Sequence, residues 1–349
     1  MRPAAPIAAL SSRKRSVRAR TPTLEPIVAQ WLQGDVFVEQ TQRRDTLRPP
    51  MPGELRVGIV DMNAGHANQA IRCLGVILDQ FERRVVAKNP GLRMTRVHVS
   101  PRDKTEEPPH DCQLYLCSGG PGSPYDGDGE DWVDDFGDLI DYVVDENVRR
   151  TNQGPGLFAV CYSFEMAVRH FELADLRPRA SRKFGVMPVY TTGDGLQHPL
   201  FEAFGDRLFA FEHRNWEAVD LDESALARNG GTLLARESRD GVSKGEALMG
   251  FDFAPGIEGV QFHPEADRPG VMAWVARPDQ AAAFKEAYGI TTYERMLKTL
   301  DDPMRLARTF ALMIPGFLTR RFNLLAGRLG YTPLDPPVHD LAAFDTRAA

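Results

Sequence analysis

The chain has 349 residues, 42% of them hydrophobic, which is enough to bury a full core. Its 42 Lys and Arg against 48 Asp and Glu give a net charge of -6, which provides no general attraction for nucleic acid or an anionic membrane. No run approaches the roughly 18 apolar residues of a membrane span, and the four cysteines form neither a CxxC pair nor a disulfide framework. We therefore expect a cytoplasmic protein without metal or cofactor.

The first segment, residues 1–54, differs from the rest in composition. Arginine and lysine recur between positions 13 and 20, no acidic residue precedes Glu25, and three prolines close the segment. This pattern predicts a basic N-terminal arm. An organelle transit peptide is the alternative, since such peptides are also rich in arginine and serine and poor in acids.

From residue 55 onward, short apolar runs alternate with helical patterns. We predict strands at 55–60, 96–99, 113–117 and 157–160, and helices at 68–84 and 132–150. Such alternation is typical of a parallel sheet covered by helices on both faces, whose active sites form at the carboxyl ends of the strands. The predicted fold class is an α/β three-layer sandwich with a mostly parallel central sheet.

Beyond residue 179 the pattern changes to short β-like pieces. They fall at 185–190, 208–211, 248–253 and 259–262, and they predict an antiparallel or mixed extension of the same sheet. We place the boundary of this domain at 55–275. Residues 276–349 form a predicted helical C-terminal extension, whose last apolar stripe packs on the domain or, as the alternative, on a partner.

An apolar strand at 157–160 runs directly into Cys161 and then into a helical pattern. A sharp strand-turn-helix elbow requires small side chains two residues before and two after its central residue, and Ala159 and Ser163 meet that requirement. A cysteine at a helix N-terminus is favoured as the reactive thiolate. A buried structural cysteine is the alternative.

Two further segments contain groups that such a nucleophile needs. His263 and Glu265 follow a predicted strand two residues apart, so that in an extended chain they share one face. The carboxylate can then orient the imidazole as a general base. A glycine-rich loop at 118–124 can offer a backbone amide that, with the amide of Tyr162, stabilises an oxyanion. By itself, each segment also fits an ordinary turn.

Together these motifs resemble the signatures of class I glutamine amidotransferases over residues 55–275, most closely the stand-alone glutaminase part of GMP synthase. The matching segments are Gly119-Gly120-Pro121-Gly122, the elbow around Cys161, and Gln261-Phe262-His263-Pro264-Glu265. The resemblance implies a flavodoxin-like fold. It also implies that Cys161 attacks a glutamine amide with His263 and Glu265 as its activating pair. Gly120 and Tyr162 would supply the oxyanion amides, and Gly122 would line the glutamine pocket.

Two positions near Cys161 depart from the family pattern. The family usually has glycine where this chain has Ser163, and glutamine where it has Glu165. Serine is small enough for the turn. We assign Glu165 to the substrate pocket; an ionised glutamate has no hydrogen-bond donor, and its charge opposes formation of a thiolate at Cys161.

The resemblance implies hydrolysis of glutamine through a cysteinyl thioester. The sequence has no phosphate-binding GxxxxGK[ST] loop, so the ammonia is expected to serve a separate synthase or acceptor subunit. One alternative is a hydrolase of γ-glutamyl peptides or conjugates with the same triad. A second is a catalytically silent binding or regulatory subunit.

Overall fold

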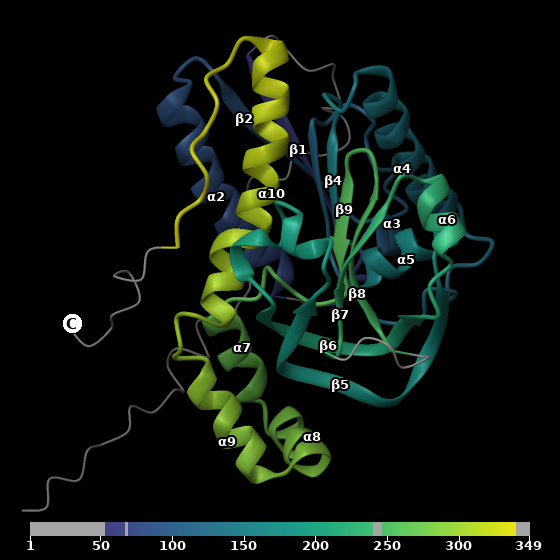
Figure 1. Ribbon diagram of the computed structural model, residues 1–349, viewed down its shortest axis with the longest axis vertical. Coiled ribbons are helices and arrows are strands. Elements are labelled where there is room, and N and C mark those ends of the chain that lie inside the picture. Colours follow the sequence, from purple (N-terminus) through teal and green to yellow (C-terminus); the bar gives the residue numbers. More distant parts are fainter. Residues whose placement is uncertain (1–52, 67–68, 240–245, 340–349) are drawn as a thin grey trace, which may run out of the picture. The chain divides into compact units, whose positions relative to one another are not determined.

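A nine-stranded sheet with a parallel half and an antiparallel half forms the centre of the fold (Figure 1). The computed structural model describes residues 53–66, 69–239 and 246–339, so that nearly all of the predicted arm at 1–54 lies outside the described residues. In spatial order the parallel half contains β2 (Arg93–Val99), β1 (Glu54–Val60), β3 (Leu114–Cys117), β4 (Gly156–Val160) and β9 (Ile257–Val260). The antiparallel half continues with β8 (Leu248–Ala254), β7 (Thr232–Arg236), β5 (Asp175–Thr191) and β6 (Arg207–Val219).

The strand β9 joins the two halves, because it pairs in parallel with β4 and antiparallel with β8. The predicted α/β class and the antiparallel extension are confirmed. β5 and β6 are longer than predicted, since they pair as a hairpin well beyond the apolar stretches, with an irregularity between Pro178 and Lys183. The strand predicted at 259–262 ends at Val260, although Gln261 N still donates to Met249 O at 3.0 Å.

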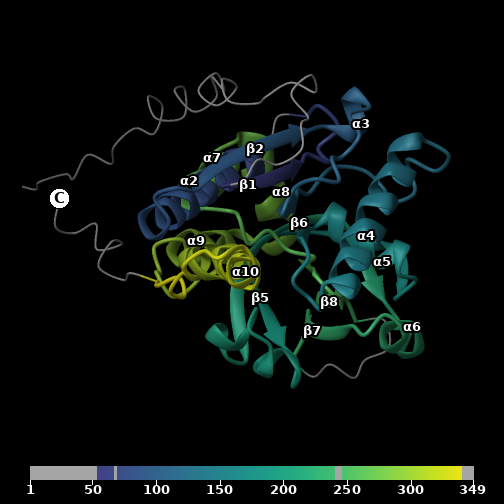
Figure 2. The same ribbon diagram turned by 90° about the horizontal axis from the view of Figure 1, so that it is seen from above.

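Helices cover both faces of the sheet (Figure 2). Side chains alternate along each strand, so Leu157 and Ala159 belong to one core cluster, and Phe158 and Val160 to the other. The first cluster lies under α4 (Asp131–Arg149) and α5 (Tyr162–His170), and the second under α2 (Ala70–Lys88) and α10 (Leu306–Leu329). Shorter elements are α3 (Pro101–Lys104), α6 (Glu223–Arg228) and the 3-10 turns Gly195–Gln197 and Glu202–Phe204.

The amphipathic pattern of α2 explains how it covers the sheet. Its buried residues recur every three or four positions and so form one stripe: Cys73, Leu74, Ile77, Leu78, Phe81 and Val85. Burying one large apolar side chain contributes about 1.5–3 kcal/mol, so such a stripe is sufficient to hold the helix in place.

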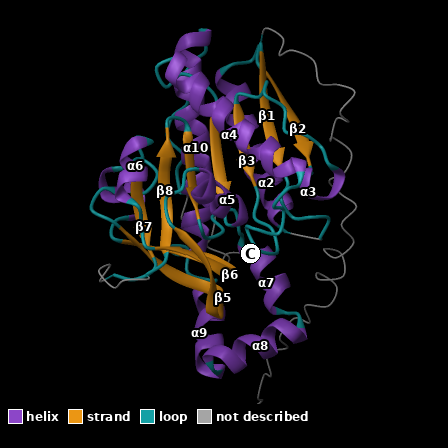
Figure 3. Cartoon of the chain, turned by 90° about the vertical axis from the view of Figure 1, so that its right-hand side faces the viewer, coloured by secondary structure: helices purple, strands orange, loops and turns teal. Residues whose placement is uncertain are grey.

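A third apolar cluster lies beside the β5–β6 hairpin (Figure 3). Phe184 on β5 packs against Phe284 with ring centroids 5.2 Å apart and against Trp274 at 5.8 Å. The helices involved are α7 (Arg268–Val275), α8 (Pro278–Tyr288) and α9 (Ile290–Thr299). Within the described residues, none of the helices is long and apolar enough to cross a membrane.

Two arginines of α10 fasten this helix to the sheet. Arg320 pairs with both carboxylate oxygens of Glu258 on β9, at 2.9 and 2.8 Å. The buried Arg321 donates to Asn147 Oδ1 at 2.6 Å and to the carbonyls of Gly154 and Pro155 at 3.0 Å. The last helix is therefore joined by buried polar contacts as well as by its apolar stripe.

Replacing Arg321 with leucine is expected to lower the free energy of unfolding by about 2 kcal/mol, because the buried carbonyl of Gly154 loses its donor and Asn147 Oδ1 and the carbonyl of Pro155 each lose one of two donors. Urea unfolding followed by circular dichroism measures this change. Arg328→Leu, on an exposed part of the same helix, is the control and should change stability by less than about 0.5 kcal/mol. Equal stability of the two variants would contradict a structural role for Arg321.

Candidate active site

Cys161 occupies a sharp turn between β4 and α5. Its backbone has φ 51° and ψ -101°, a conformation that non-glycine residues rarely adopt and that costs about 1–3 kcal/mol. Ser163 is fully buried, and its Oγ donates to the carbonyl of Ser118 at 2.6 Å, which leaves no space for a larger side chain. The turn has the predicted strand-turn-helix form, with Tyr162 as the first residue of the helix.

His263 and Glu265 lie just beyond the end of β9. His263 N donates to the carbonyl of Phe211 on β6 at 2.8 Å, and this bridge fixes the backbone next to the imidazole. His263 Nδ1 lies 2.8 Å from Glu265 Oε1, and the carboxylate is almost fully buried. Burial alone lowers the pKa of His263, but the Glu265 carboxylate and Cys161 together raise it well above its ordinary value.

Gly119 brings the thiol and the imidazole together. A Cβ added at this glycine would lie 2.8 Å from His263 Cε1 and 3.2 Å from Cys161 Cβ. Because glycine has no side chain, both residues can pack against the backbone of Gly119. Because Nδ1 of His263 is bonded to Glu265, Nε2 is the nitrogen available to the thiol. The geometry is the one in which a thiol, a base and a group that orients the base can act together.

The loop after β3 packs against the loop after β1. A Cβ at Gly120 would lie 2.0 Å from the carbonyl oxygen of Met62, so only glycine fits. Arg102 on α3 donates to the carbonyls of Met62 and Pro121 at 2.8 and 2.9 Å, and its guanidinium lies 4.0 Å from the ring centroid of Tyr162. Arg102 thereby holds the loop against the elbow. The predicted oxyanion amides, of Gly120 and Tyr162, lie on these two segments, and their role stays a prediction.

Comparison with solved structures identifies the architecture. The chain is similar to a glutamine amidotransferase from Thermotoga maritima, with a TM-score of 0.52 and 16% identity over 76% of this chain and 97% of the other. It is similar to the structure of SMU.1228c, with a TM-score of 0.51 and 16% identity over 77% and 100% of the two chains. The chain has a glutamine amidotransferase fold. Neither a protein-family model nor a curated protein matches its sequence.

Within this glutamine amidotransferase fold, Gly122 lies in the loop that follows Gly120. Its φ of 101° favours glycine, and an added Cβ would lie 2.5 Å from Asp126 Oδ2. Ser123 N donates to the same Asp126 oxygen at 2.7 Å, and Tyr162 Oη donates to the carbonyl of Ser123 at 3.2 Å. The loop is thus closely tied to the elbow, while the role of Gly122 in binding glutamine stays a prediction.

Glu165, the family-atypical residue, lies buried behind Cys161. Its Oε1 accepts a hydrogen bond from Gln261 Nε2 at 2.9 Å, and the same nitrogen lies 4.0 Å from Cys161 Sγ. Burial raises the pKa of Glu165 to about 7, while the Gln261 hydrogen bond and Arg214 act in the opposite direction. Glu165 is therefore linked to Cys161 through Gln261, and its assignment to the substrate pocket stays a prediction.

The raised pKa of Glu165 makes stability depend on pH. The folded state keeps its proton up to about pH 7 while the unfolded chain loses it near 4.5, so this carboxyl destabilises the fold progressively as pH rises between these values. Glu165→Gln should therefore be more stable than wild type by about 3 kcal/mol at pH 8 but not at pH 4. Urea unfolding at both pH values measures the difference. An equal gain at both would contradict the ionisation argument.

Among the described residues, no group of three or more His, Cys, Asp or Glu side chains is arranged to hold a metal ion. The four cysteines are free and buried.

Proposed function

We propose that this protein is a cysteine-dependent glutaminase of the amidotransferase type, with Cys161, His263 and Glu265 as its catalytic residues. The observation that supports this proposal most strongly is the meeting of a strained elbow cysteine with an imidazole whose other nitrogen is bound to a buried carboxylate. This arrangement is the one that covalent acyl transfer requires.

In the proposed reaction the Cys161 thiolate attacks the side-chain carbonyl of glutamine. The amides of Gly120 and Tyr162 stabilise the oxyanion of the tetrahedral intermediate. The intermediate breaks its C–N bond as the His263 imidazolium protonates the departing ammonia, which leaves a γ-glutamyl thioester. Water, deprotonated by His263, then hydrolyses the thioester to glutamate and regenerates the thiolate and the imidazolium.

The ammonia is useful only where a second active site consumes it. The sequence contains no GxxxxGK[ST] phosphate-binding loop. We therefore infer that a separate synthase subunit uses the ammonia.

Glutamine is favoured over a larger γ-glutamyl substrate. A Glu165 whose charge altered the substrate pocket would favour a larger substrate. Its carboxyl group is buried and bonded to Gln261 instead of facing solvent, so it gives no support to a leaving group larger than ammonia.

Treatment with a glutamine-mimicking chloroketone, followed by peptide mass spectrometry, tests this function. We expect one adduct, on Cys161, that glutamine prevents and that Cys161→Ala abolishes. Protection by a γ-glutamyl dipeptide but not by glutamine would favour the conjugate hydrolase instead. Absence of any adduct on Cys161 would favour the silent subunit.

A further inference from the structure

The hydroxyl of Ser163 connects the elbow to the glycine-rich loop after β3. Ser163 is the second residue of α5, and its side chain is fully buried. Its Oγ donates to the backbone carbonyl of Ser118 at 2.6 Å. The amidotransferase pattern usually has glycine at this position, and glycine could not form this bond. The contact is therefore a feature of this chain that its resemblance to the family does not explain.

Gly119, next to Ser118, gives the loop no constraint of its own. A Cβ added at Gly119 would lie 2.8 Å from His263 Cε1, so the site requires glycine here. Glycine accepts a wider range of backbone angles than any other residue. The peptide that carries the Gly120 amide therefore needs contacts with other groups to keep one direction.

Two serine hydroxyls hold the peptides on either side of Gly119. Ser163 Oγ bonds to the carbonyl before this glycine, that of Ser118. Ser118 Oγ accepts from Met62 N at 2.9 Å, and its own proton is shared between the Gly119 carbonyl at 2.9 Å and Asp61 Oδ1 at 3.3 Å. Both carbonyls that border the freely rotating Cα of Gly119 thus have a donor.

These bonds also set the direction of the Gly120 amide. The described residues contain no cis peptide bond, and in a planar trans peptide the N–H points away from the preceding carbonyl. Fixing the Gly119 carbonyl on Ser118 Oγ therefore directs Gly120 N–H away from that hydroxyl, which bonds to the loop after β1. Cys161 follows β4, and β4 lies on the other side of β3 from β1.

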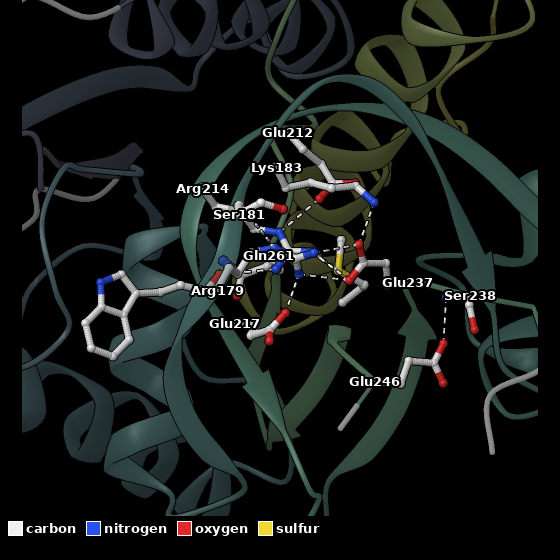
Figure 4. Close-up of polar contacts among 12 residues, drawn as sticks. Arg179, Ser181, Lys183, Glu212, Arg214, Glu217, Glu237, Ser238, Glu246 and Gln261 are labelled. Atoms are coloured by element: carbon white, nitrogen blue, oxygen red, sulfur yellow. Dashed lines mark hydrogen bonds and ion pairs between the residues drawn. The ribbon is translucent and has the colours of Figure 1, made fainter. Parts of the chain in front are cut away.

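A second bond from the first turns of α5 leads elsewhere. Glu165, two residues after Ser163, accepts from Gln261 Nε2 at 2.9 Å. Figure 4 shows Gln261 among polar side chains of the antiparallel half of the sheet. The elbow is thus held from two sides, and the Ser163 bond is the one that reaches the glycine-rich loop.

We propose that Ser163 is a positioning residue whose hydroxyl, through the Ser118 carbonyl, keeps the Gly120 amide directed at the oxyanion. The proposal rests on the proposed function, since it takes Cys161 as the nucleophile and Gly120 as an oxyanion donor. Ser163 acts through the loop and not on the reacting atoms. Its loss therefore weakens a contact made in the transition state and leaves the thiol and the imidazole in place.

Acylation of Cys161 by p-nitrophenyl acetate, compared with its alkylation by iodoacetamide, tests this proposal. In acylation the thiolate adds to the ester carbonyl to form an oxyanion, and the C–O bond then breaks, which releases p-nitrophenolate and leaves an acetyl thioester. Iodoacetamide loses iodide by direct displacement and forms no oxyanion. Ser163→Ala should slow acylation about tenfold and leave alkylation at the wild-type rate. Cys161→Ala gives the background rate of p-nitrophenolate release.

Glutamine hydrolysis gives a second readout. Ser163→Ala should lower kcat about tenfold and change KM by less than about twofold, because the oxyanion exists only after the substrate has bound. Ser163→Gly, which restores the residue usual in the family, should behave like Ser163→Ala. It also decides the question if Ser163→Ala does not fold, since it leaves no side chain to be accommodated.

Thr319→Val is the matched control, because it removes another buried hydroxyl that donates to a backbone carbonyl. Thr319 Oγ1 donates to Pro315 O at 2.7 Å within α10. This variant should lower the melting temperature and leave acylation, alkylation and kcat unchanged. If Ser163→Ala also lowers only the melting temperature, or slows acylation and alkylation equally, Ser163 has a structural role only and the proposal is wrong.

Because p-nitrophenyl acetate needs no glutamine pocket, the two proposals fail separately. A wild-type protein that hydrolyses no glutamine, but whose acylation slows selectively in Ser163→Ala, would refute the glutaminase function alone. Normal glutamine hydrolysis by both the wild type and Ser163→Ala would refute the role of Ser163 alone.

Discussion

Cys161→Ala is expected to hydrolyse glutamine at least about 10⁴-fold more slowly than the wild-type protein. Alanine lacks the sulfur that forms the thioester, but it keeps the Cβ and disturbs the elbow little. Release of ammonia and glutamate, measured in a coupled assay, gives the rate. Thermal unfolding followed by circular dichroism tests whether the variant is folded as stably as the wild type, so that the lost rate can be assigned to the missing sulfur.

Cys112→Ala serves as the control for this experiment. Cys112 is buried in another part of the core, in contact with Asp111, and its replacement should leave glutamine hydrolysis at the wild-type rate. If Cys161→Ala retains most of its activity while Cys112→Ala loses it, the wrong cysteine has been identified as the nucleophile.

Glu265→Gln is expected to lower kcat/KM for glutamine by about 10³-fold. The amide has nearly the shape of the carboxylate but no charge. It therefore cannot hold the pKa of His263 well above its ordinary value, as Glu265 does across a distance of 2.8 Å. The imidazolium is then lost at a lower pH, and it is no longer present on the alkaline side to protonate the departing ammonia. Rates measured from about pH 5 to pH 9 should show a loss that is greatest on the alkaline side.

Glu223→Gln, on the exposed surface of α6, is the matched control and should have the wild-type pH profile. A Glu265→Gln variant with a normal rate at neutral pH would mean that His263 needs no carboxylate partner. The proposed triad would then reduce to a pair.

The parallel half of the sheet could be predicted largely because strands such as β3 and β4 are continuous apolar runs. Strand β4, for example, is buried at all five of its positions. The strands of the antiparallel half were harder to predict from the sequence. Strand β7 is short and was not predicted, and the first part of β5 is largely exposed and polar, so that only pairing with β6 defines it. Whether such segments form strands depends on their pairing with distant segments, which no local sequence pattern encodes.

The candidate site was predictable to the extent that its residues fall in short local motifs. Cys161, His263 and Glu265 each follow a predicted strand, and the structure brings them together. Arg102 carries no such signal, because its role depends on contacts with segments distant in the chain.

The left-handed backbone of Cys161 also bears on how this position would change under mutation. At φ 51° the backbone conformation favours glycine over any residue with a side chain. Mutations selected only for higher stability would therefore tend to replace Cys161 with glycine. A protein that only needed this turn would have no reason to keep sulfur there. The sulfur at this position thus opposes the preference of the main chain, as expected where reactivity constrains a residue more than robustness does.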